Sequence, residues 1–133
     1  MAFVLDASIS AVWALADESS AVADRAAELL KTEFALVPPL WWYEVRNLLV
    51  VNERRLRMTV DDSTLFLELL SSYPIRTDMI EDEELTLRLA RDCGLSFYDA
   101  AYLAVAKRNR IAIATLDKAL RSAAVREGIP LLA

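Results

Sequence analysis

The chain has 133 residues, of which 56% are hydrophobic, and it carries a formal net charge of −5. This length fits one domain with its own core, so we expect a single domain over residues 1–133. The apolar content excludes a disordered tail, and the acidic balance does not by itself indicate nucleic-acid binding.

The residue types that are missing exclude several kinds of site. The chain has no histidine, which removes Ser-His-Asp and Cys-His catalysis, zinc fingers and His-ligated metals. The only glycines are Gly94 and Gly128, so neither a P-loop nor a dinucleotide-binding loop is present. The single cysteine, Cys93, favours a reducing compartment. Without a charged N-terminal start or an apolar run of membrane-spanning length, we expect a soluble, cytoplasmic protein.

Short apolar strands alternate along the chain with longer helical patterns. The strands are expected over residues 2–6, 34–37, 74–77, 111–115 and 130–132. The helices are expected over residues 8–16, 20–31, 39–54, 59–72, 81–93, 96–110 and 117–126. Capping-box patterns begin two of these helices, Thr59 with Asp62 and Ser96 with Asp99. The alternation predicts an α/β fold, a parallel sheet with helices on both faces, in which ligands bind at the carboxyl ends of the strands.

Four carboxylates are predicted to meet at that edge. Asp6 ends the first strand, and Asp117 follows the strand over 111–115. Glu44 lies about 7.5 Å along the helix that follows the second strand. Asp99 lies at the start of a helix about 16 Å long, and the strand over 111–115 that follows runs antiparallel to this helix. Asp99 is therefore expected at the same height as Asp117. Each aspartate also has a simpler interpretation: Asp6 as a loop acid or helix cap, Asp99 as a capping-box partner, and Asp117 as an N-cap.

Glu44 is harder to explain as a solvent-exposed charge. At 100° per residue it shares a helix face with Leu40 and Leu48, whereas Arg46 and Glu53 lie opposite. A carboxylate on an apolar face must pair, bind a metal or change its pKa. Oxygen-only ligands favour Mg²⁺ or Mn²⁺ over zinc and copper, and such an ion can activate water and neutralise a phosphodiester.

Four segments carry a resemblance to a known family: FVLDAS, VPPLWWYEVRN, LSFYDAAYLAVA and ATLDKAL. Over its whole length the chain resembles PIN-domain ribonucleases, and among them the VapC toxins of type II toxin–antitoxin pairs. The resemblance implies a three-layer sandwich with a parallel sheet of four to five strands. It implies that the catalytic and Mg²⁺/Mn²⁺-binding residues are Asp6, Glu44, Asp99 and Asp117. It also implies supporting roles for Ser8, Asn47 and Thr115.

The resemblance further implies a metal-dependent endoribonuclease that cuts tRNA or ribosomal RNA, forms a homodimer and is inhibited by a VapB-like antitoxin. An acidic protein needs cationic strips to bind RNA. The first candidate strip is formed by Arg46, Arg54, Arg55 and Arg57, and a less favoured one by residues 107–110. Charge at helix ends is the simpler interpretation of both.

Two other functions compete with this one. The first is a PIN-like protein- or RNA-binding module without catalytic turnover. Its acidic pocket would not bind divalent metal. The second is a phosphatase or receiver-like domain, but the segment Asp6-Ala7-Ser8 lacks the second aspartate that a DxD phosphatase needs.

Overall fold

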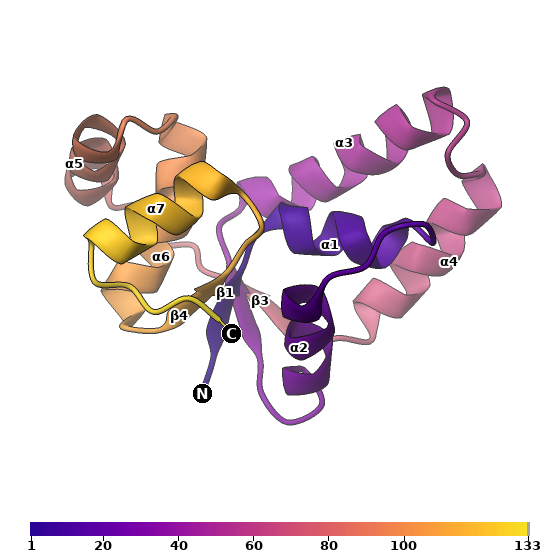
Figure 1. Cartoon of the computed structure of the whole chain (residues 1–133), viewed down its shortest axis with the longest axis horizontal. Coiled ribbons are helices and arrows are strands. Elements are labelled where there is room, and N and C mark those ends of the chain that lie inside the picture. The colour runs from indigo at the N-terminus through magenta and orange to yellow at the C-terminus, as the bar shows by residue number, and fades with distance from the viewer. Residues whose placement is uncertain (133) are drawn as a thin grey trace.

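The computed structural model describes residues 1–132, and its centre is a parallel sheet. The strands are β1 (Phe3–Leu5), β2 (Ala35–Val37), β3 (Ile75–Thr77) and β4 (Ala112–Ala114). They form a four-stranded sheet in the order β3-β2-β1-β4, with every pairing parallel (Figure 1). The α/β class and the parallel sheet are therefore confirmed. The expected edge strand over 130–132 is reduced to a single parallel bridge between Ile113 and Leu131.

Helices occupy every segment in which the sequence predicted one. They are α1 (Ala7–Ala14), α2 (Ala21–Leu29), α3 (Leu40–Arg54), α4 (Val60–Ser71), α5 (Glu83–Cys93), α6 (Phe97–Asn109) and α7 (Lys118–Arg126). Figure 1 shows α5, α6 and α7 on one side of the sheet and α1, α2 and α4 on the other, with α3 running across one end. None of the helices in the described part of the chain has the length and hydrophobicity that a membrane span requires.

The core is built around β1 and α6. All three residues of β1 are buried, which is expected of a central parallel strand covered on both faces. Helix α6 contacts β1, β2 and β4 on one side and α5 and α7 on another, so it is buried around most of its circumference. This position fixes the first turn of α6, where Asp99 lies, relative to the end of β1.

The two predicted capping boxes have different outcomes. Both hydrogen bonds of the box between Thr59 and Asp62 are formed, so that prediction is confirmed. At α6 the Asp99 N–H donates to Ser96 Oγ at 3.1 Å, but the return bond from the Ser96 N–H to the Asp99 carboxylate is missing from the hydrogen bonds of residues 1–132. The second box is therefore only half formed.

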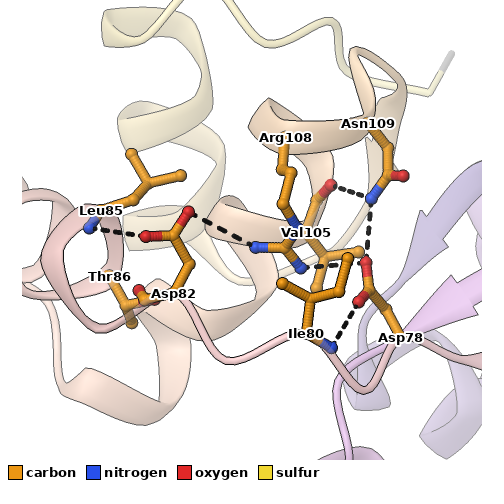
Figure 2. A network of polar contacts seen from close by, with 8 residues as sticks. All are labelled: Asp78, Ile80, Asp82, Leu85, Thr86, Val105, Arg108 and Asn109. Carbon is orange, nitrogen blue, oxygen red and sulfur yellow. Dashed lines mark hydrogen bonds and ion pairs between the residues drawn. The ribbon is translucent and has the colours of Figure 1, made fainter.

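A buried ion pair ties the loop between β3 and α5 to α6 (Figure 2). Arg108 Nη2 donates to Asp78 Oδ2 at 2.9 Å, and Arg108 Nη1 lies 3.9 Å from Asp82 Oδ2. Asn109 and the Ile80 N–H also donate to the Asp78 carboxylate, at 3.0 and 2.9 Å. Burial alone would raise the pKa of Asp78, but these hydrogen bonds together hold it below its usual value. The network lies beside a cavity of about 460 Å³ and pairs two of the acids that follow β3, Asp78 and Asp82.

We predict that Arg108→Met destabilises the protein by about 2 kcal/mol, because it removes the charged hydrogen-bond donor of the Asp78 carboxylate. The Asp78 side chain is only 7% exposed, so the carboxylate depends on the donors that the protein supplies. Urea unfolding measures the change. The control, Arg91→Met on α5, removes an exposed charge and should cost less than about 1 kcal/mol. Equal stability of the two variants would show that the network does not hold the loop.

Candidate functional site

Asp6 places a buried carboxylate at the carboxyl end of β1. The residue is 6% exposed, and its Oδ2 accepts hydrogen bonds from Ser8 Oγ and Thr115 Oγ1, both at 2.7 Å. Burial raises the pKa of Asp6, and the hydrogen bonds from the two hydroxyls only partly oppose this effect. Asp6 also stands at the N-cap position of α1, yet its side chain is bonded across the sheet edge to the end of β4. The structure thus places the two expected hydroxyls directly on this acid.

The same hydroxyls join the ends of two neighbouring strands. Ser8 Oγ accepts from the Leu116 N–H, and Thr115 Oγ1 accepts from the Asp117 N–H, both at 3.0 Å. Asp117 then caps α7, because its Oδ1 accepts from the Leu120 N–H at 2.9 Å. The simpler interpretation of Asp117 as an N-cap is therefore correct for one carboxylate oxygen, and Oδ2 is not used by this cap.

Glu44 comes from α3 and is held by a residue that the sequence analysis did not identify. Tyr102 Oη donates to Glu44 Oε1 at 2.5 Å, and Tyr102 is fully buried on α6. Burial raises the pKa of Glu44 by more than the hydrogen bond from Tyr102 lowers it. The negative charges of Asp6 and Asp99 raise it further. One signal was present in the sequence: Tyr102 lies within an apolar stretch over residues 100–106, and a buried tyrosine must find a partner for its hydroxyl.

Asp99 completes the set from the first turn of α6. Burial raises its pKa most, followed by the negative charges of Asp117 and Asp6. The four acids therefore act on one another electrostatically, although they come from four separate segments of the chain. Asp6 and Asp99 repel Glu44, while Asp117 and Asp6 repel Asp99.

The carboxylates share one region without converging on a single point. Among residues 1–132, no three acidic or cysteine side chains lie close enough together to hold a metal ion. The donor set itself fits a hard divalent cation, since every candidate ligand is an oxygen. Coordination would require the side chains to close on the ion.

Asn47 lies on the same face of α3 as Glu44. Both border a shallow groove of about 350 Å³ together with the first turn of α1. The full lining consists of Ala7, Ser8, Glu44, Asn47, Leu48, Val51 and Asn52. The groove is therefore continuous with Ser8, which bonds Asp6, and Asn47 contributes an exposed amide to its wall.

The four arginines of the expected RNA-binding strip are not equivalent. Arg57 Nη2 lies 3.3 Å from Asp17 Oδ1 and 3.2 Å from Glu18 Oε1, so its charge is used within the protein. Arg46 stacks on the Trp42 ring, with its Cζ atom 4.3 Å from the ring centroid. Two further arginines, Arg54 and Arg55, are exposed at the end of α3 and form none of the ion pairs found in residues 1–132. The less favoured strip is also engaged, through ion pairs of Lys107 and Arg108.

A parallel α/β sheet with acidic side chains at its carboxyl edge is the architecture of the PIN domain. Residues 3–126 match the PIN domain family, and the chain belongs to that family. PIN domains are typically metal-dependent ribonucleases and usually bind Mg²⁺. No match was found among curated proteins.

Two solved structures share the fold. The first is PAE2754 from Pyrobaculum aerophilum, with 28% identity and a TM-score of 0.67, covering 92% of this chain and 79% of that one. The second is VapC20 from Mycobacterium tuberculosis, described as a sarcin-ricin loop cleaving toxin. It has 17% identity and a TM-score of 0.59, and the match covers 92% of this chain and 95% of VapC20.

The burial of Asp99 and its repulsion by neighbouring acids predict how stability depends on pH. Because the pKa of Asp99 is raised, the folded protein binds this proton more tightly than the unfolded chain does. Its contribution to the free energy of unfolding therefore falls as the pH rises above about 4. Asp99→Asn should stabilise the metal-free protein at neutral pH by about 0.5–1 kcal/mol, a range kept small by solvent screening.

Urea unfolding of the metal-free protein at several pH values measures this effect. The control is Asp61→Asn, which removes a first-turn acid from α4 and should lower stability slightly through the helix dipole. If Asp99→Asn behaves like Asp61→Asn at every pH, the acids do not repel one another enough to matter.

Proposed function

We propose that this chain acts, as a single PIN domain over residues 1–133, as a metal-dependent endoribonuclease toxin of the VapC type. It would hydrolyse RNA phosphodiester bonds at the site formed by Asp6, Glu44, Asp99 and Asp117. The observation that carries the proposal is that acids from separate segments lie at one edge of the sheet, where Asp6 is buried and charges on neighbouring acids act on Glu44 and Asp99. Such an excess of negative charge at a sheet edge is what a divalent cation would relieve. Membership of the PIN family and the VapC-like fold support the proposal.

The four carboxylates would hold Mg²⁺ or Mn²⁺. When bound, such an ion supplies Lewis-acid chemistry that lowers the pKa of water and neutralises charge on a phosphodiester. Asp6 provides a fixed ligand, because two hydroxyls and burial leave its side chain little freedom. Asp99 and Asp117 are more exposed than Asp6, so an RNA substrate would reach the site from their side. Glu44 retains Oε2 as an acceptor while Oε1 is bonded to Tyr102.

Partners follow from the VapC assignment. The proposal includes a tRNA or ribosomal RNA substrate, a VapB-like antitoxin that blocks the acidic groove, and a homodimer in the cytoplasm. Structural similarity to a toxin that cleaves the sarcin-ricin loop supports an RNA target. The single cysteine suits a reducing compartment.

A binding module without catalytic turnover is the second candidate. It is favoured by one observation, the absence of three acids close enough to hold a metal within residues 1–132. In that case the acidic edge would have no affinity for metal, and association with RNA or protein would be the main activity.

Thermal unfolding of the purified protein across a Mn²⁺ titration separates the two candidates. The wild type should be stabilised in a saturable way, by about 2.7 kcal/mol when Mn²⁺ reaches about 100 times its dissociation constant. Asp99→Asn should lose this response and should not cleave RNA. A wild-type protein that millimolar Mn²⁺ does not stabilise would contradict the nuclease proposal and favour the binding module.

RNA binding should depend on the exposed end of α3. In an Asp99→Asn background, which prevents cleavage, Arg54→Gln with Arg55→Gln should weaken binding of unfractionated tRNA. The slope of log affinity against log salt should fall by about 2, because two phosphate contacts are lost. Fluorescence anisotropy over a salt series measures both quantities.

The control pair, Arg91→Gln with Arg126→Gln, makes the same change of charge on α5 and α7, on the other side of the sheet (Figure 1). If both pairs weaken binding equally, the end of α3 has no special role and the effect is one of net charge.

A further inference from the structure

Tyr102 places a buried hydroxyl between two acids of the candidate site. It lies three residues beyond Asp99, on the same side of α6, and its side chain is fully buried. The hydroxyl donates to Glu44 Oε1 at 2.5 Å. Burial, the bond to Glu44, and the negative charges of Glu44 and Asp6 together raise the pKa of Tyr102, and the backbone N–H of Ala7 opposes them. The hydroxyl therefore lies where α3, α6 and the start of α1 meet.

This hydrogen bond has a clear consequence for Glu44. Glu44 is only half-buried, and it is repelled by both Asp6 and Asp99. An unrestrained glutamate in this position would rotate toward solvent, where its charge is hydrated and distant from the other acids. A donor from the protein interior opposes that rotation and fixes Oε1 on the inner side. Asp6 is held in a comparable way, by hydroxyls of Ser8 and Thr115.

We propose that Tyr102 is a positioning residue that holds Glu44 in the acidic pocket, where its second oxygen is available to a divalent cation. The inference rests on the proposed metal-dependent function and adds a residue that acts through Glu44 without touching the ion. Residues that orient metal ligands commonly change metal affinity 10- to 100-fold when they are removed. Tyr102 would have this role because no other hydrogen bond to the Glu44 side chain is formed within residues 1–132.

The test compares two tyrosines of the same helix by the Mn²⁺ concentration that gives half of the maximal thermal stabilisation. Tyr102→Phe should raise this midpoint about tenfold or more. Tyr98→Phe, four residues earlier and 68% exposed, should leave it unchanged. Tyr102→Met, which also fills the core without a hydroxyl, should give the same shift as Tyr102→Phe and serves if the phenylalanine variant folds poorly. Equal midpoints for Tyr102→Phe and Tyr98→Phe would overturn the proposal.

A double-mutant comparison separates positioning from a general loss of structure. In a Glu44→Asp background, Tyr102→Phe should have little further effect on the Mn²⁺ midpoint, because the shorter side chain keeps its charge but is one methylene too short for the bond to Tyr102 Oη. A full additional shift in that background would mean that Tyr102 acts through the fold and would contradict the proposal. A wild type with no Mn²⁺ response would overturn the proposed function itself, and a positioning role with it. A response in the wild type that Tyr102→Phe retains overturns only the role of Tyr102.

Discussion

The burial of a carboxylate at the end of β1 is the constraint from which the rest of the site follows. Asp6 cannot be hydrated freely, so the protein must supply its hydrogen bonds. It does so with Ser8 and Thr115, whose hydroxyls also accept from the backbone of the loop that follows β4. The ends of two parallel strands are thereby joined, and the loop delivers Asp117 to the same edge. Removing the acid would leave both hydroxyls without their shared acceptor.

A second consequence is electrostatic. Glu44 and Asp99 approach Asp6 from helices on different parts of the fold, and each has a raised pKa, due first to burial and then to neighbouring acids. Burying acids close to one another costs stability, which makes this edge of the sheet a candidate functional site. The ion pairs of the molecule lie elsewhere, as with Arg108 and Asp78. Within the described residues none of these four acids forms an ion pair: hydroxyl groups donate to Asp6 and Glu44, and the nearby Arg121 guanidinium donates to the Thr115 carbonyl instead. This is the condition under which a metal ion would bind.

The pattern of apolar and polar residues along the chain predicted much of the fold. The alternation of short apolar strands with helices predicted the parallel sheet, and the positions just after two strands predicted Asp6 and Asp117 as site residues. What the sequence could not supply were contacts between distant segments. The bond between Tyr102 and Glu44 joins residues 58 positions apart, and the pairing of Arg57 with Asp17 spans 40. Asp99 shows a further limit, since a capping-box pattern fixes the helix start but not whether the acidic side chain folds back to it.

The central claim is that these carboxylates form one divalent-metal site, and crystallography of the protein soaked in Mn²⁺ tests it most directly. Data collected near the manganese absorption edge locate the ion without reference to any activity. The account predicts an anomalous peak bounded by oxygens of Asp6, Asp99 and the neighbouring acids, with their side chains drawn inward from the positions described here. An ordered site without such a peak, in crystals that bind manganese elsewhere, would contradict it.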